Sequence, residues 1–165
     1  ALDAATKAAE VEVSYGRSFY AGASNASTPN AGEVIGILAA KTPGALRSGM
    51  EAALSELTRV GFELTHNVPY LAHTVSSVGT YLAKEAGVKQ GEALAYLIAP
   101  PLEGMYAMDA ALKAAEVRLC KLYAPPSETN FGGGLLTGTQ SACDAACAAF
   151  AAAVTEVAAQ PMERM

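Results

Sequence analysis

The sequence has no tryptophan and few charged residues. Only 16% of its 165 residues are charged, below the quarter that is usual in soluble domains. Small residues, alanine above all, supply much of the 52% hydrophobic fraction, so one chain alone would bury a thin core. An apolar surface with little charge is typical of a protein whose edges are covered by neighbours.

Basic residues are also scarce. Eleven Lys and Arg face sixteen Asp and Glu, and the net charge of −5 argues against nucleic acid as a partner. The three cysteines are an odd number in no disulfide framework spacing, which fits a reducing compartment. We expect no run long enough to span a bilayer and find no signal-peptide pattern in residues 1–13, so the sequence predicts a cytoplasmic, soluble chain.

One phrase occurs twice. Residues 1–13 read ALDAATKAAEVEV and residues 107–119 read AMDAALKAAEVRL, with nine of thirteen positions identical. Alanines would coincide by chance in such helices, but the shared Asp, Lys, Glu and Val at one offset favour a duplication.

The order of predicted elements repeats as well. Each copy is a helix, a strand, a loop, a strand and a helix, over residues 1–58 and 103–158. Runs of Val, Ile and Leu predict buried strands at 34–40 and 93–100, and Thr42 and Thr139 are expected to cap the helices that follow. The last helix should extend to about Ala158, with this inner face: Ala142, Ala146, Phe150, Val154 and Val157.

The middle of the chain separates the two copies. Residues 61–70 predict a short strand and an irregular loop, and residues 71–87 a mainly helical segment that Gly87 ends. We assign a first domain to residues 1–58 and a second to 59–165. Because the second copy has a leading segment that the first lacks, we expect roughly 50 further residues before Ala1 in the natural chain.

The repeated phrase resembles the bacterial microcompartment shell domain. Two such units, each led by elements that ordinarily end the domain, resemble the circularly permuted tandem shell proteins, above all the ethanolamine-utilisation shell protein L group and its ethanol-utilisation relatives. The resemblance covers nearly the whole chain and is most specific over APPLE, PPSETN and LTGTQSACDAAC. It implies an α/β fold of the α+β, ferredoxin-like kind: two sandwiches of mostly antiparallel sheet with helices, the first incomplete.

The resemblance also implies a function. Such proteins are non-catalytic structural tiles: three chains form a pseudohexameric disc, and discs and other shell proteins tile the wall of a cytoplasmic microcompartment. Small metabolites pass through pores, and the central pore of this subfamily can be gated. No cofactor and no metal is implied.

Two groups of residues take pore roles by the resemblance. The loop at 61–69, about three residues shorter than in relatives, would line the three-fold axis with these candidates: Phe62, Glu63 and His66. Tyr20 and Glu103 would line a small pore within the subunit and contact a polar ligand.

Three of the polar and sulfur-bearing residues also have purely structural interpretations. Glu103 falls in a first helical turn, where the helix dipole alone favours a carboxylate. Cys143 and Cys147 lack the further ligands that zinc needs and are expected to pack against an alanine face.

A function of a different class stays open from the sequence. The chain could be an oligomeric α/β protein that binds or senses a small molecule near Tyr20 and Glu103. An enzyme is less favoured, because Ser127 and Glu128 have no histidine near them in the sequence and no catalytic group of acid, base and nucleophile is visible.

Overall fold

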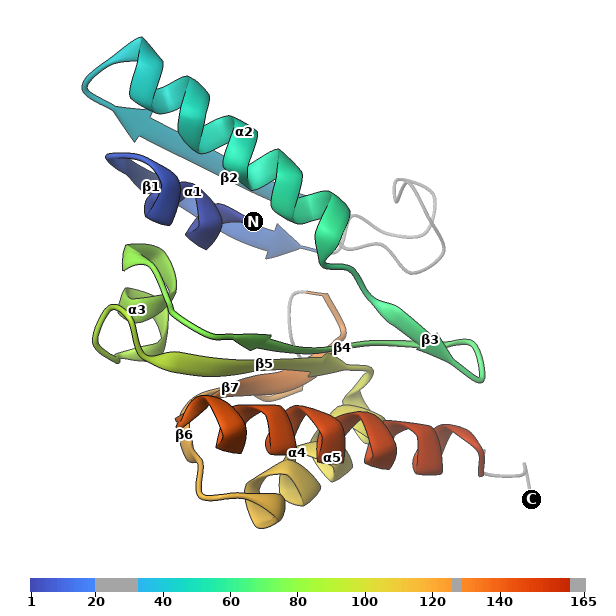
Figure 1. Cartoon of the computed structure of the whole chain (residues 1–165). Coiled ribbons are helices and arrows are strands. Elements are labelled where there is room, and N and C mark those ends of the chain that lie inside the picture. The colour runs from blue at the N-terminus through green and yellow to red at the C-terminus, as the bar shows by residue number, and fades with distance from the viewer. Residues whose placement is uncertain (20–32, 126–128, 161–165) are drawn as a thin grey trace. The chain divides into compact units, whose positions relative to one another are not determined.

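The chain divides into two compact units in a computed structural model that describes residues 1–19, 33–125 and 129–160 (Figure 1). The first unit is Ala1–Gly61 with Ser77–Gly91, and the second is Phe62–Ser76 with Glu92–Met165. Packing therefore places the segment around α3 (Thr80–Ala86) with the first unit, although this segment follows the start of the second domain in the sequence. The assignment of 1–58 and 59–165 to two ancestral copies concerns sequence descent and stays a prediction.

The second unit is a five-stranded sheet with two helices. Its elements are β3 (Glu63–Thr65), β4 (Val68–Val75), β5 (Ala93–Ala99), α4 (Pro101–Ala114), β6 (Arg118–Tyr123), β7 (Gly132–Gly138) and α5 (Gln140–Ala158). The strand order is β3-β4-β5-β7-β6, and every neighbouring pair is antiparallel. Figure 1 shows α4 and α5 together on one face of this sheet. The predicted α/β fold with a mostly antiparallel sheet is confirmed.

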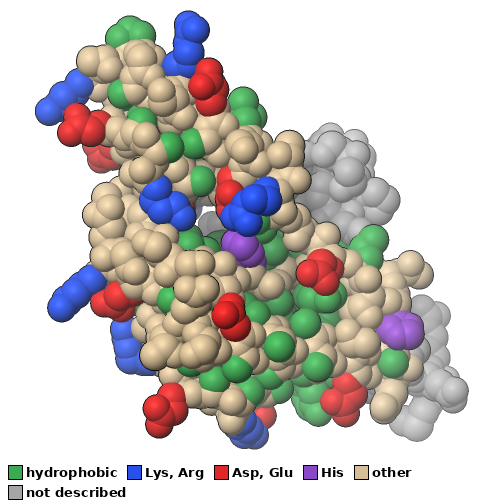
Figure 2. Space-filling view, viewed as in Figure 1, with side chains coloured by type: hydrophobic (Ala, Val, Ile, Leu, Met, Phe, Trp, Pro, Cys, Tyr) green, Lys and Arg blue, Asp and Glu red, His purple; other side chains and the backbone are tan. Residues whose placement is uncertain are grey.

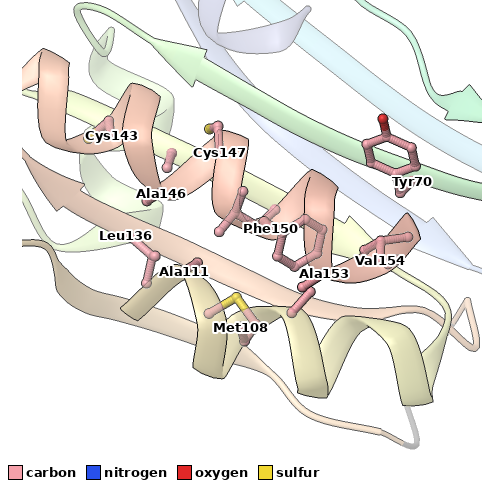
Figure 3. Close-up of a cluster of buried hydrophobic side chains, with 14 of the residues drawn as sticks. Tyr70, Met108, Ala111, Leu136, Cys143, Ala146, Cys147, Phe150, Ala153 and Val154 are labelled. Carbon is pink, nitrogen blue, oxygen red and sulfur yellow. The ribbon is translucent and has the colours of Figure 1, made fainter. Parts of the chain in front are cut away.

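The core of the second unit lies between α5, α4 and the sheet (Figure 3). Three of the five residues expected on the inner face of α5 are buried, namely Ala146, Phe150 and Val154, whereas Ala142 and Val157 are partly exposed. The buried stripe is completed by Cys143, Cys147 and Ala153. The two cysteines are packing residues, as predicted, and burial raises the pKa of both thiols.

Helix α5 is also long and apolar. It has 19 residues with a mean hydropathy of 1.3, so by length and composition alone it could cross a membrane, and the expectation that no run is long enough is wrong. This is weak evidence for a span, because a core helix passes the same test. In α5 the apolar side chains form the stripe that packs on the sheet and on α4.

The first unit has a smaller sheet. It contains α1 (Leu2–Ala8), β1 (Val11–Phe19), β2 (Glu33–Ala40), α2 (Pro43–Arg59) and α3. Strands β1 and β2 form an antiparallel pair. The prediction that residues 34–40 form a buried strand is right about the strand and wrong about burial, since the side chains of Val34, Ile35 and Ile37 are exposed. Among the described residues β2 hydrogen-bonds with β1 alone, whereas its counterpart β7 lies between two strands.

The structure also corrects the segment 71–87. Residues 71–75 belong to β4 and pair with β5 from Leu71↔Ile98 to Val75↔Leu94, so only Thr80–Ala86 is helical. The stretch VPYLAHTV is rich in β-branched and aromatic residues, and its pairing with β5, whose partner residues lie 19 to 27 positions along the chain, decides its conformation. Gly87 ends α3 in a left-handed conformation with φ 64°, as predicted.

The duplication is visible in the geometry of both copies. Strand β1 has a bulge between Val13 and Tyr15, and β6 has one between Leu119 and Lys121, at positions 106 residues apart. Thr42 and Thr139 each accept a hydrogen bond from a backbone N–H three residues on, at 3.2 Å. Both predicted caps are thus confirmed, and the two copies share their register as well as their sequence.

Candidate functional site

The three candidate gate residues lie on or beside one β-hairpin. Strands β3 and β4 are joined by the two residues His66 and Asn67, whose φ angles are 49° and 65°. Two consecutive left-handed residues form a type I′ kind of turn, which matches the twist of a hairpin and suits Asn, with His a less common occupant. The loop that we expected to be irregular is therefore a tight turn, consistent with its short length.

The hairpin extends beyond the rest of the sheet. Residues 68–70 of β4 pair with β3, and the pairing of β4 with β5 begins only at Leu71. Figure 1 shows the β3–β4 tip at one end of the second unit. Glu63, Leu64 and His66 are exposed there. The sequence thus places a carboxylate, an aliphatic side chain and an imidazole on a projecting element.

Phe62 lies at the base of the hairpin. Its ring meets the ring of Phe131 edge-on, with centroids 5.7 Å apart and an angle of 66° between the planes. Phe62 nevertheless remains 53% exposed. Such a pair contributes about 0.5–1.5 kcal/mol beyond its buried area, so the aromatic side chain has a defined resting position and still presents a face to solvent.

Glu63 is held by its cross-strand neighbour. The Tyr70 hydroxyl donates a 2.7 Å hydrogen bond to Glu63 Oε2, and these two residues face each other in the register of β3 and β4. This hydrogen bond, with a smaller contribution from burial, raises the pKa of Tyr70 to about 12. The carboxylate of Glu63 is therefore oriented by the sheet and is not a freely rotating surface charge.

Glu103 stands on a different element from the hairpin. It is part-exposed in the first turn of α4, which begins after Pro100 without a side-chain cap. The next residue, Gly104, packs so tightly that an added Cβ would lie 3.0 Å from the carbonyl oxygen of Gly132. Tight packing fixes where Glu103 projects. Tyr20, its expected partner, lies outside the described residues.

The described residues show little that could carry catalysis. They contain no group of three or more His, Cys, Asp or Glu side chains able to hold a metal ion. Ser127 and Glu128 lie outside the described ranges. The second unit has a shallow, open depression of about 720 Å³ whose charged lining residues are Glu92, Glu116 and Arg118. This depression does not include Glu103 or the hairpin.

Comparison with known proteins gives close relatives. No family model matches the chain. The chain is 61% identical over 166 residues to the bacterial microcompartment shell protein EutL of Clostridium perfringens, covering 98% of this chain and 76% of that protein. It is 47% identical over 168 residues to EutL of Escherichia coli, covering 99% of this chain and 77% of that protein.

Solved structures agree with these relatives. Crystal structures of EutL from Clostridium perfringens and from Leptotrichia buccalis match with TM-scores of 0.90 and 0.91, at 61% and 59% identity. They cover 98% and 99% of this chain, and 75% and 77% of their own chains. A trimeric bacterial microcompartment shell protein, PduB, shares the fold with a TM-score of 0.80 at 20% identity, over 94% of this chain and 70% of its own. These matches confirm the predictions of a tandem shell-protein fold and of a structural protein rather than an enzyme.

Proposed function

Because this chain belongs to the EutL family of bacterial microcompartment shell proteins, we propose that it forms the trimeric tiles of an ethanolamine-utilisation microcompartment shell in the bacterial cytoplasm. The observation that carries this proposal is the 61% identity to a EutL protein along 98% of the chain. The match to the ethanol-utilisation protein EtuB is 21% identical, which supports ethanolamine rather than ethanol as the substrate of the compartment.

The repeat supports a pseudohexameric arrangement. Two copies with the same bulge positions and the same helix caps give each chain two similar edges. Three chains then supply six similar units around one axis, and a closed ring of this kind covers the apolar edges of every member.

The β3–β4 hairpin is the proposed lining of the central pore. Phe62, Glu63 and His66 would meet their symmetry copies at the three-fold axis, where a ring of carboxylates or imidazoles selects what passes. The projection of the hairpin and the exposure of these side chains support the role. The contact of Phe62 with Phe131 gives the aromatic side chain a defined closed or open position from which it could move.

A second passage is proposed within each subunit, between Tyr20 and Glu103. Glu103 contributes a part-exposed carboxylate in the first turn of α4. A carboxylate there can accept hydrogen bonds from a small cationic or hydroxylated metabolite.

Electron microscopy of concentrated protein tests the tile directly. We expect flat hexagonal sheets built from discs of equal spacing, since discs with covered edges associate side by side. Discrete particles without sheets, from a protein that stays monomeric at micromolar concentration, would contradict the proposal. For the pore, Phe62→Ala and Glu63→Gln should leave sheet formation unchanged while altering the passage of ethanolamine through the assembled shell.

A further inference from the structure

The short helix α3 obtains its N-terminal cap from another helix. Asp3 Oδ2 accepts a 2.8 Å hydrogen bond from the Gly79 N–H, and Asp3 Oδ1 accepts one of 2.9 Å from the Leu82 N–H. The residue at the cap position is Gly79, which has no side chain to do this. In Figure 2 the Asp and Glu side chains in view lie at the surface, whereas Asp3 is only 5% exposed. Helix α1 thus holds the first turn of α3 through a buried carboxylate.

Further contacts fasten the same segment to α1. Lys7 Nζ donates a 3.1 Å hydrogen bond to the Ser77 carbonyl oxygen. A Cβ added to Gly79 would contact the Thr6 hydroxyl, so the two backbones approach closely at this point. The sequence places Asp3 and Lys7 four residues apart, which indicates only a surface ion pair. The capping role depends on a segment more than seventy residues along the chain.

The fastened segment connects two paired strands. Residues 76–92 join β4 to β5, and the last pair of that ladder is Val75↔Leu94. By packing, most of this connection belongs to the first unit, although both strands belong to the second. Hairpin loops usually have about 2–5 residues, and a longer free loop costs more entropy to close. Here a 2.9 Å hydrogen bond from the Gly91 N–H to the Val78 carbonyl oxygen closes the base of the connection.

The bonds to α1 lie close to the end of this ladder. Ser77 and Gly79, which bind Lys7 and Asp3, are two and four residues beyond Val75, the last residue of β4. The end of a strand pair opens readily when the chain beyond it is free. Two fixed points so near the end of β4 therefore oppose opening of the β4–β5 ladder from this side.

The second copy has the same pair of side chains without such a segment. Asp109 and Lys113 are the counterparts of Asp3 and Lys7 at an offset of 106. Their side chains are 63% and 73% exposed and pair with each other at 2.6 Å. Among the described residues, Asp109 is bonded to Lys113 alone. Asp109 is therefore a matched control for the role of Asp3.

We propose that residues 76–92 act as a clasp, through which α1 of the first unit keeps the end of the β4–β5 ladder closed. Asp3 is the positioning residue of this clasp, and Lys7 supports it. When the bonds to Asp3 are lost, the connection is free and the ladder opens inward from Val75 and Leu94. The two units thereby unfold in a coupled manner. The inference concerns the single chain and does not rest on the proposed trimer.

Hydrogen exchange measured residue by residue under native conditions tests the clasp. In Asp3→Asn we expect the amides of Leu82 and of the Val75↔Leu94 end of the ladder to exchange about tenfold faster, the effect of losing one charge-assisted hydrogen bond. The amides of β7 should keep their wild-type rates, and Asp109→Asn should match the wild type throughout. Faster exchange at Leu82 without faster exchange at the ladder end would overturn the inference, and so would equal acceleration throughout β7.

A disulfide in place of the lost cap provides a rescue. Thr6→Cys combined with Gly79→Cys joins the same two segments, because a Cβ on Gly79 would contact the Thr6 side chain. In the Asp3→Asn background, the oxidised form of this double variant should restore slow exchange at the ladder end, and its reduced form should not. If the ladder end exchanges equally fast in both forms, the clasp does not hold it.

The contribution of Lys7 is tested in the same way. Lys7→Met keeps the length of the side chain and removes its hydrogen bond to Ser77. We expect the same amides to exchange faster as in Asp3→Asn, by a smaller factor, since Lys7 is partly exposed. A different set of accelerated amides would contradict a shared clasp.

Discussion

Leu57 in α2 and Val154 in α5 occupy corresponding positions of the repeat, 97 residues apart like the helix caps Thr42 and Thr139. Leu57 is nevertheless 63% exposed, whereas Val154 is fully buried. Ile37 in β2 and Leu135 in β7 differ in the same way, at 52% and 0% exposure. These side chains are similarly apolar in the two copies. Burial in this molecule is thus decided by which strands and helices surround a copy.

The strand neighbours account for the difference. Strand β7 lies between β5 and β6, and its sheet carries α4 and α5. Strand β2 hydrogen-bonds with β1 alone among the described residues. Side chains that close a core in the second unit therefore lie open in the described part of the first.

Truncation of an apolar side chain to alanine should give the largest difference in stability between the two units. Phe150→Ala removes the largest fully buried side chain and should lower the free energy of unfolding by about 3–5 kcal/mol. Leu57→Ala in the unassembled chain should change it by no more than about 0.5 kcal/mol. Urea denaturation followed by circular dichroism measures both, and equal losses would show that α2 is packed as α5 is.

Glycine at position 133 gives the next largest effect. Gly133 has φ 144°, and an added Cβ would clash with the Leu97 carbonyl oxygen of the neighbouring strand β5. Ile35 stands at the corresponding place in β2, where no such strand is paired among the described residues. Gly133→Ala should cost about 2–4 kcal/mol from strain and overpacking. Gly61→Ala, at an open position, is the control and should leave the denaturation midpoint nearly unchanged.

The two aspartates separate a buried cap from an exposed one. Asp3→Asn should lower the free energy of unfolding by about 1.5–3 kcal/mol, because one of two buried N–H groups loses its acceptor. Asp109→Asn in the unassembled chain removes only a surface pair with Lys113 and should cost less than about 1 kcal/mol. Hydrogen exchange of the Leu82 amide should accelerate in Asp3→Asn alone. Similar acceleration in both variants would mean that Asp3 does not specifically hold α3.

The smallest effect concerns a feature that the two copies share. Thr42→Ala and Thr139→Ala each remove a cap with the same 3.2 Å geometry on an exposed helix start. Each should cost about 1 kcal/mol. Paired thermal melts would show whether the two losses agree within a few tenths of a kcal/mol, and a clear difference would show that the caps depend on the surrounding unit.

Features that depend only on residues close in sequence could be predicted. The threonine caps and the left-handed Gly87 are of this kind, and the structure confirms them. The prediction of a helix at residues 71–75 is wrong, because their conformation depends on pairing with β5, which lies further along the chain. The exposure of β2 and the burial of Asp3 were missed for the same reason, since each follows from which distant element lies alongside.

The same distinction between local features and distant contacts applies to the candidate site. The short segment at 61–69 and its aromatic Phe62 could be found from sequence, and the hairpin then brings Glu63 and His66 onto one projecting element. The hydrogen bond from Tyr70 to Glu63 and the contact of Phe62 with Phe131 could not be predicted, because both join residues across a strand pairing or a long loop.

Native mass spectrometry of the chain measures directly whether it forms a trimer. We expect a dominant species of three copies, three times the chain mass of 16.8 kDa, that persists at micromolar concentration. A spectrum in which the single chain dominates at every concentration would contradict it.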